Sequence, residues 1–312
     1  MIKLCENFKD INQENYLLFY AGCTNKSLIY PKKLQKVTFC IPTYNNEDTI
    51  ENCLKSIKFQ NYENIEIIVI DGYSSDKTIK IAKKYCNKIL FDSGTYGSAC
   101  QTGVENSNGD IIALFDSDIY IPHKNWLTEA VKCFLINHHI STVWPLLISP
   151  PNSSSFAKLY QNNMHKIFIE HRMKKKIGLF GGGNSLIKRS YLIEIGGIDR
   201  TIHWGADFFW AQKLKEKGYQ VMYYPDPLYH DTMKTFPIFF KKQIHGAKTF
   251  STHGFESMGL STSNVIYEHF VLGIKKMMVG IFINKDYSWC YYPLVLITRG
   301  FIYFISFLKS RF

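Results

Sequence analysis

Two aspartates, Asp116 and Asp118, stand on either side of Ser117 directly after the apolar run 112–115. Carboxylates at alternate positions after a buried strand suit one hard divalent cation, which they would share with a diphosphate. A third aspartate, Asp71, also follows an apolar run, and its oxygens could accept hydrogen bonds from a base or a ribose. Each of these aspartates, taken alone, also fits an ordinary turn.

Strands and helices must bring these aspartates together, and the sequence predicts that the two alternate. Strands are predicted over 37–41, 65–70, 88–91, 110–115, 141–148 and 219–224, and helices over 49–57, 77–85, 97–109, 125–137, 156–176 and 207–217. This alternation predicts an α/β fold with a mostly parallel, Rossmann-like central sheet flanked by helices. Ligands of such sheets bind at the carboxyl ends of the strands, so we expect the three aspartates to line one crevice. A turn is predicted at Pro225-Asp226-Pro227, after the last strand.

Composition limits the classes of function. The 312 residues are 46% hydrophobic, which excludes a disordered chain, and the net charge of +11 favours an anionic partner. Nucleic acid is not expected as that partner, because the basic residues form no known recognition module. The eight cysteines are too widely spaced for a zinc ribbon. Because no secretory signal is recognisable at the N-terminus, we expect reduced thiols in a cytosolic setting.

Short motifs stand in a fixed order along the chain. They occur at 37–45, 68–78, 103, 109–110, 116–118, 182–185, 196–199, 205–207, 214, 218–219 and 229–230. In this order they resemble the inverting glycosyltransferases of family two, which have the GT-A fold. The resemblance covers residues 37–231 and implies a metal-dependent transferase of class EC 2.4, which moves a sugar from a nucleotide-diphosphate sugar to a hydroxyl group.

The resemblance also implies roles for individual residues. Asp207 would be the general base that deprotonates the acceptor hydroxyl, held ionised by the N–H groups of a helix start. Asp118 and His230 would hold a divalent cation, Mn²⁺ or Mg²⁺. The nucleotide and the sugar, with a UDP-sugar expected first, would contact Pro42, Thr43, Tyr44, Asn45, Asp71, Gly97, Asp116 and Ser117.

Two positions depart from the family pattern. Cys100 stands where many relatives carry an arginine that helps to neutralise the diphosphate, and Ala206 replaces the first acid of a common pair. The cation itself, or one of the residues Lys188, Arg189 and Arg200, could replace the missing positive charge. The departures leave open a catalytically silent relative that binds a nucleotide sugar or a partner enzyme. A nucleotidyltransferase is disfavoured, because residues 42–45 lack the glycine-rich basic loop of that class.

The last part of the chain, 235–312, combines aromatic residues with lysine pairs. The segment 289–308 is the most apolar, but Arg299 lies near its middle and Pro293 near its start. Core helices, an in-plane membrane anchor and a single span all remain open. We favour an anionic membrane surface at the cytoplasmic side of the cell membrane, with a glycan or a polyprenyl-lipid-linked acceptor.

The domain organisation follows from these patterns. Residues 1–36 form an N-terminal extension, 37–148 the nucleotide-sugar-binding half of a GT-A domain, and 149–234 the acceptor-binding half. Residues 235–312 form a helical, membrane-associating region. The proline- and serine-rich stretch 149–155 is the clearest loop between the two halves.

Overall fold

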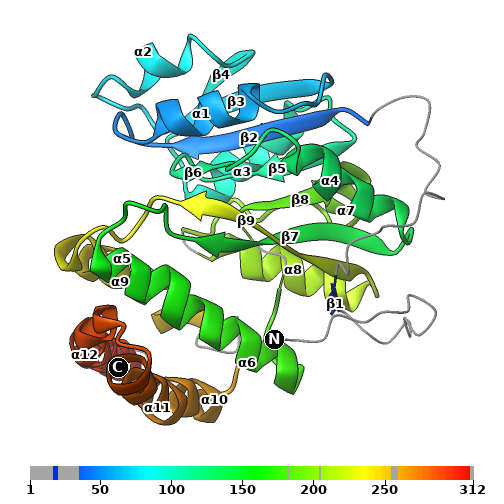
Figure 1. The fold of residues 1–312 in the computed structure, drawn as a ribbon. Coiled ribbons are helices and arrows are strands. Elements are labelled where there is room, and N and C mark those ends of the chain that lie inside the picture. Colours follow the sequence, from blue (N-terminus) through cyan, green and yellow to red (C-terminus); the bar gives the residue numbers. More distant parts are fainter. Residues whose placement is uncertain (1–16, 20–34, 181–182, 204, 254–258, 310–312) are drawn as a thin grey trace. The chain divides into compact units, whose positions relative to one another are not determined.

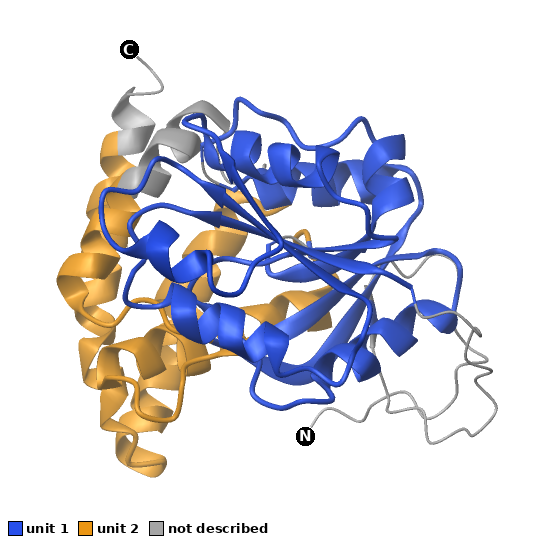
Figure 2. Ribbon diagram, turned by 90° about the horizontal axis from the view of Figure 1, so that it is seen from above, with its two compact units in different colours: residues 1–146, 180–229 blue, residues 147–179, 230–312 orange. Residues whose placement is uncertain are grey.

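The computed structural model describes residues 17–19, 35–180, 183–203, 205–253 and 259–309. The chain divides into two compact units, drawn in different colours in Figure 2. Unit 1 comprises residues 1–146 and 180–229, and unit 2 comprises 147–179 and 230–312. Most of the expected N-terminal extension, and Gly182 of the 182–185 motif, lie outside the described residues. The donor and acceptor halves expected from the sequence stay predictions.

A nine-stranded sheet organises the described part of unit 1 (Figure 1). Its order is β1-β9-β7-β8-β5-β2-β3-β4, and β6 pairs with β9. The strands are β1 Leu17–Phe19, β2 Val37–Thr43, β3 Ile65–Asp71, β4 Lys88–Phe91, β5 Ile111–Leu114, β6 Ile119–Tyr120, β7 Ile140–Ile148, β8 Ser185–Lys188 and β9 Gln220–His230. His230 is the final residue of β9 and is described with that strand.

The direction of the strands confirms part of the prediction. Strands β3 and β5 both pair with β2 in parallel, and β4 continues the parallel pairing beyond β3. Strand β8, which the sequence analysis missed, runs antiparallel to both β5 and β7 and makes the sheet mixed. Four residues between a glycine cluster and a helix are too short a run to show a strand period.

Helices cover both faces of this sheet. In β2, β3 and β5, side chains such as Cys40, Ile68 and Leu114 form one core cluster with Trp210 and Leu214 of α8. Strand side chains alternate, so Phe39 points the other way, where its ring meets Phe115, which in turn meets Trp126 of α4. The helices of unit 1 are α1 Ile50–Lys58, α2 Thr78–Ala82, α3 Tyr96–Glu105, α4 Trp126–Lys132, α7 Arg189–Glu194 and α8 Ala206–Glu216.

The turn predicted at 225–227 is wrong, because β9 continues through Pro225 and Pro227 to His230. Residues two apart in a strand direct their backbone N–H groups to the same neighbour, so both prolines remove donors from one side only. Between them, the carbonyl of Asp226 accepts a hydrogen bond from Trp126 Nε1 at 3.1 Å. The longer strand carries His230 to the edge where the aspartates lie.

Unit 2 is helical in its described part. The helix predicted over 156–176 is present as α5 Ser155–Lys158, a π-helical turn η3 Leu159–His165 and α6 Lys166–Lys175. The remaining segments are α9 Phe236–His253, α10 Thr262–Ile266, η5 Tyr267–Leu272, α11 Gly273–Met278, η6 Val279–Ile283, η7 Tyr287–Tyr291 and α12 Tyr292–Lys309. Their core includes Phe156, Phe239, Trp289 and Tyr292. None of the helices in the described residues has the length and apolar character needed to cross a membrane.

Candidate active site

The parallel register brings three strand ends to one edge of the sheet. Thr43 at the end of β2 pairs with Asp71 at the end of β3. Leu114 of β5 pairs with Cys40 of β2, so Asp116 lies just beyond the sheet on the same side. The ends of these strands therefore lie together at one edge of the sheet, as predicted, and a ligand crevice between the loops that follow them stays a prediction.

Asp71 is fully buried and organises the loop that follows it. Its two carboxylate oxygens accept hydrogen bonds from the backbone N–H and the hydroxyl of Ser74, at 2.7 and 2.6 Å. Gly72 N donates to Thr43 O at 2.8 Å and ties this loop to the end of β2. The structure thus gives Asp71 a structural function, and its contact with a base stays a prediction.

Asn45 and Asn46 join the loops to one another. The backbone of Asn45 has a left-handed φ of 50°, and its side-chain oxygen accepts from Ser75 N at 2.9 Å. Asn46 Nδ2 donates to the buried hydroxyl of Ser117 at 2.7 Å. These bonds fix the three loops before any ligand arrives, which lowers the entropic cost of binding.

Tyr44 stands out from this rigid frame, because its side chain is 62% exposed while Thr43 is buried. Pro42 is half-buried within β2. An exposed aromatic ring beside an ordered loop can stack on a nucleobase, since every base has a π-face. Tyr44 is therefore the side chain of residues 42–45 that is best placed to touch a ligand directly.

The side chains of Tyr96 and Asn184 hold the carboxylate of Asp116 at this edge. Tyr96 Oη donates to Asp116 Oδ1 at 3.0 Å, and Asn184 Nδ2 donates to Oδ2 at 2.9 Å. The backbone N–H of Asp116 donates in turn to Asn184 Oδ1 at 2.8 Å. Both oxygens are thereby oriented, and each keeps acceptor capacity for a further partner.

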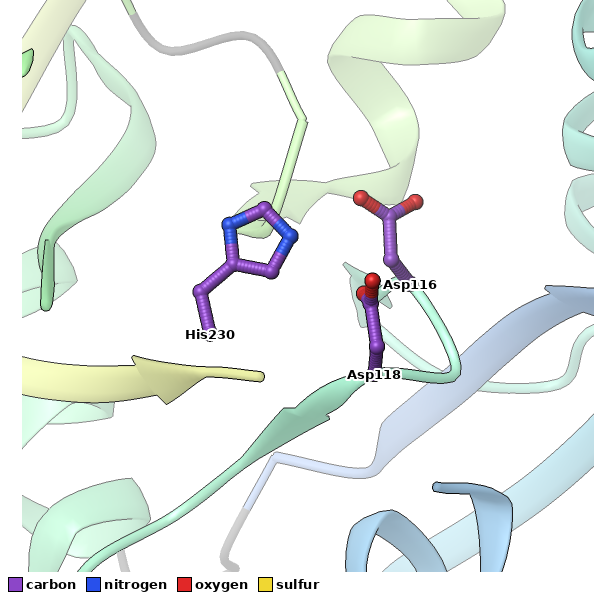
Figure 3. Close-up of side chains that lie close together, drawn as sticks. All are labelled: Asp116, Asp118 and His230. Atoms are coloured by element: carbon purple, nitrogen blue, oxygen red, sulfur yellow. The ribbon is translucent and has the colours of Figure 1, made fainter. Parts of the chain in front are cut away.

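Asp116, Asp118 and His230 form a cluster that could hold a metal ion, shown in Figure 3. One ligand atom from each residue lies within 4.8 Å of the others, and all three residues are half-buried. Two carboxylates and one imidazole suit a divalent cation such as Mn²⁺, and carboxylates also suit Mg²⁺. The residues therefore fit the expected cofactor. Asp116, which the sequence analysis assigned to the ribose or the sugar, joins Asp118 and His230 in this set.

Asp207 is the second residue of α8, and Gly205 occupies the N-cap. Burial raises the pKa of Asp207 to about 6, against the hydrogen bond from Gly183 N at 3.1 Å, and the charge of Asp116 raises it further. Burial therefore outweighs the N–H groups of the helix start in setting this pKa, and the role of Asp207 as the general base stays a prediction. A carboxylate with a pKa near 6 is a stronger base than a free aspartate and is still ionised at neutral pH.

Gly97 has a packing reason to be glycine. A Cβ atom at this position would lie 2.1 Å from the carbonyl oxygen of Asp199, and Gly97 N donates to Ile202 O at 3.0 Å. The start of α3 and the loop at 199–202 therefore touch backbone to backbone. Contact between Gly97 and the donor stays a prediction.

Cys100 is fully buried in the core cluster, and two of the proposed replacement cations are wrongly placed. Lys188 pairs with Ile111, which begins β5, so Lys188 and Arg189 lie at the opposite edge of the sheet from Asp116. Arg200 forms ion pairs with Asp92 and Glu105. A cation that the Asp116 cluster could hold is thus the best remaining candidate for the positive charge beside a diphosphate.

Two residues of the site were missed as participants by the sequence analysis. Asn184 was noted only as part of the 182–185 motif, and its backbone φ of 58° shows why a small polar residue suits this turn. Nothing in the sequence indicates that Tyr96 belongs to the site, because an aromatic residue at the start of a helix is usually part of the core. It is the fold of α3 that brings its hydroxyl to Asp116.

Comparisons with known proteins agree with this fold. The family described as Glycosyl transferase family 2 matches residues 38–196, just over half of the chain. Glycosyltransferase AglE of Haloferax volcanii is 25% identical over 68% of this chain and 72% of its own length. The uncharacterized glycosyltransferase RT0329 of Rickettsia typhi is 38% identical over 69% of this chain and 66% of its own length.

The mannosyltransferase PcManGT of Pyrobaculum calidifontis, solved with GDP-Man and Mn²⁺, shares the fold. It superposes with a TM-score of 0.63 at 17% identity and covers 90% of this chain and 88% of its own. At this identity the likeness concerns the fold alone. With the family match over residues 38–196 and a mixed sheet that carries its aspartates at the carboxyl edge, the chain belongs to glycosyl transferase family 2 and is a glycosyltransferase of the GT-A fold.

Proposed function

We propose that this enzyme transfers a sugar, with inversion, from a nucleotide-diphosphate sugar to a hydroxyl group, and that it depends on a divalent cation. The observation that carries this proposal is the pairing of two sites near Asp116: a cation-binding cluster and a carboxylate, Asp207, whose pKa is about 6. A Cβ at Gly183 would lie 3.8 Å from Asp207 Oδ2 and 3.9 Å from Tyr96 Oη, and this hydroxyl donates to Asp116, so Asp207 and the cluster are neighbours.

Each group has a defined part in the reaction. Asp207 takes the proton of the acceptor hydroxyl while the acceptor oxygen forms a bond to the anomeric carbon. The bond from that carbon to the diphosphate oxygen breaks, and its electron pair leaves with the diphosphate on the opposite face. A cation held by Asp116, Asp118 and His230 would offset the negative charge of the leaving diphosphate. Tyr96 and Asn184 keep the Asp116 carboxylate in place.

The donor and the acceptor are the finer part of the proposal. A UDP-sugar is the first donor to test, and GDP stands beside it because PcManGT is described with GDP-Man. Tyr44 would stack on the base, with Asp71 and Asn45 shaping the loop beneath it. The acceptor would be a glycan or a polyprenyl-linked glycan at the cytoplasmic face of the cell membrane, which the basic net charge of +11 favours.

Calorimetric titration of UDP, GDP and dTDP, with and without Mn²⁺, tests the donor site. We expect one nucleotide to bind only with Mn²⁺, and Asp118→Asn to abolish this dependence. Asp110→Asn is the matched control, because Asp110 directly precedes β5 at the opposite edge of the sheet, where its carboxylate accepts from Lys36 N. No binding of any of the three nucleotides by the wild type would reject the donor site.

A second measurement separates an enzyme from a silent relative. The wild type and Asp207→Asn are incubated with radiolabelled nucleotide sugar and a lipid extract, and transfer is followed by chromatography. Transfer by the wild type alone, with equal donor binding by both proteins, supports Asp207 as the base. Donor binding without any transfer or donor hydrolysis by the wild type would favour the silent relative.

A further inference from the structure

The helices of unit 2 carry apolar side chains on their exposed side. In α12, Leu294, Ile297, Phe301 and Phe304 are 38 to 70% exposed and follow one another at spacings of three and four residues. The opposite side of the same helix is buried at Tyr292, Val295, Thr298 and Ile302. This spacing places the exposed residues in one stripe along the helix.

The continuous helical run from α10 to η6 repeats the pattern. Its exposed side chains include Phe270, Val271, Ile274, Met278, Phe282 and Ile283, with exposures from 38 to 71%. This run approaches α12 closely at Gly273, where there is no room for a side chain. A Cβ added there would lie 1.7 Å from the hydroxyl of Tyr292. These six residues and the four of α12 are called the apolar face below.

Two charged residues of these helices, Glu268 and Arg299, lie inside. Glu268 is fully buried and accepts a bidentate pair of hydrogen bonds from Arg172, at 2.9 and 2.7 Å. His171 Nδ1 lies 3.2 Å from the same carboxylate. A helix in water normally turns its glutamate outward and its phenylalanines inward. At Glu268, which is buried, and Phe270, which is half-exposed, this usual polarity is therefore inverted.

In α12, the charged side chain of Arg299 also lies on the inner side, because its guanidinium points into unit 2. It lies 2.8 Å from His269 Nε2 and 3.2 Å from Gln243 Oε1, and it sits over the rings of Tyr160 and Phe239. Burial and the neighbouring Arg299 lower the pKa of His269 to about 3, so its ring is neutral and accepts this bond. The charge in the middle of the apolar segment is thus turned away from the apolar face.

Exposed lysines accompany the apolar face. Lys275 and Lys276 lie in α11, Lys285 follows η6, and Lys241 lies in α9. Lysines beside apolar and aromatic side chains match the anionic headgroups and the acyl boundary of a bilayer. A protein partner would need no such combination of exposed lysines and apolar stripes along two separate helices.

We propose that the apolar face lies in the plane of an anionic bilayer, with its phenylalanines and isoleucines at the acyl boundary and Lys275, Lys276 and Lys285 at the headgroups. That this bilayer is the cytoplasmic face of the cell membrane rests on the proposed function. The inference adds to that proposal the protein surface that binds the membrane. Its residues all belong to unit 2, and it requires no contact with the aspartates of unit 1.

Co-sedimentation of the full chain with vesicles tests the inference. The vesicles contain phosphatidylcholine alone or a mixture with phosphatidylglycerol, and UDP and GDP binding is measured on the same preparations. We expect binding to the anionic vesicles, and a loss of roughly tenfold or more in partition for the double variant Phe282→Ser/Ile283→Ser, since two large apolar side chains leave the bilayer. Lys275→Glu/Lys276→Glu should remove the preference for phosphatidylglycerol.

The matched control is Phe59→Ser/Ile193→Ser, because these side chains are 65 and 56% exposed on unit 1. It should bind vesicles like the wild type. Equal binding of the Phe282 variant and the control, or no binding by the wild type, would overturn the inference. A concentration-dependent dimer that the Phe282 variant disrupts, without vesicle binding, would assign the face to a second copy instead. Vesicle binding without nucleotide binding would reject the proposed function and leave the membrane surface standing.

Discussion

Asp116 and Asn184, 68 residues apart in the sequence, hold each other by a reciprocal pair of hydrogen bonds. The antiparallel register makes this possible, because Leu114 of β5 pairs with Ser185 of β8 and the two residues lie just beyond that pair. To reach this position, Asn184 adopts a left-handed backbone conformation with a φ of 58°. The carboxylate that begins the Asp-Ser-Asp motif is therefore positioned by a strand that the motif itself does not predict.

Substitutions at Asn184 should distinguish the contribution of its side-chain hydrogen bonds from that of its left-handed backbone conformation. Asn184→Gly keeps the left-handed conformation and removes both side-chain bonds, whereas Asn184→Ala removes the bonds and adds strain of about 1 kcal/mol. We expect both variants to bind Mn²⁺ and nucleotide roughly tenfold more weakly, and the alanine variant to unfold at a lower temperature than the glycine variant. Calorimetry and thermal unfolding measure the two effects, and equal binding by the wild type and both variants would contradict the positioning role.

Tyr96→Phe should weaken donor binding without harming the fold. The substitution keeps the ring and removes the hydroxyl that donates to Asp116 Oδ1 at 3.0 Å. One lost hydrogen bond to a charged acceptor costs about 1.5 to 3 kcal/mol, which predicts a loss of roughly ten- to hundredfold in Mn²⁺-dependent nucleotide affinity. Tyr191→Phe is the control, since its hydroxyl donates to His138 O. A loss of affinity in both variants would show a general effect on packing.

The acid side of the pH–rate profile should report Asp207. The base acts in its ionised form, and its pKa is about 6, so the rate should be level near pH 8 and fall about tenfold per pH unit well below pH 6. The measurement is kcat/KM for the donor between about pH 4.5 and about pH 9, a range that includes the pKa of Asp207 at about 6. A profile that stays level down to about pH 4.5 would remove Asp207 from the role of base.

The same raised pKa predicts a cost in stability. The folded state holds the Asp207 proton more tightly than the unfolded chain, whose ordinary value is 3.8, so stability is lost as the pH rises from about 4 through about 6. Asp207→Asn should therefore be more stable than the wild type at pH 8, by about 1 to 3 kcal/mol, while transfer is abolished. Urea unfolding at pH 8 and at pH 4 measures the difference, which should shrink at the lower pH.

Asp76→Asn is the control, because the pKa of Asp76 is shifted in the opposite direction to that of Asp207. The pKa of Asp76 is lowered, since hydrogen bonds from Thr78 and Glu47 outweigh the effect of burial. Its contribution to stability is present above pH 4 and is lost as the pH falls, so its substitution should destabilise the protein at pH 8. If Asp207→Asn and Asp76→Asn both destabilise, the raised pKa of Asp207 is contradicted.

The sequence predicts the half of the site that is built from local patterns. Apolar runs ending in Asp71 and Asp116 are strands followed by loops, and parallel strands place their carboxyl ends at one edge. What escapes prediction depends on partners distant in sequence. The hydroxyl of Tyr96, the amide of Asn184 and the balance that raises the pKa of Asp207 arise only when α3, β8 and α8 pack together. No spacing in the chain encodes them.

The tail shows the same limit in another form. The composition around 289–308 fits a core helix, an in-plane anchor or a span equally well, because hydropathy records how apolar a segment is and not which way each side chain points. In the structure, Arg299 faces inward to His269 while Phe301 is 61% exposed. Packing, which sets this orientation, leaves an apolar stripe exposed along α12.

Gly97→Ala should destabilise the fold, and this distinguishes packing from donor binding at a position predicted to touch the nucleotide. The added Cβ would lie 2.1 Å from the carbonyl oxygen of Asp199, a backbone atom that can move only with its whole loop. Overpacking of this kind costs about 1 to 3 kcal/mol, so the unfolding temperature should fall by several degrees. Gly183→Ala is the matched control at the site itself, because its Cβ would meet Asp207 and Tyr96 at ordinary distances of 3.8 and 3.9 Å. Calorimetric unfolding and nucleotide titration are measured on both variants, and a Gly97→Ala protein with wild-type stability but weakened nucleotide binding would assign Gly97 to the donor instead.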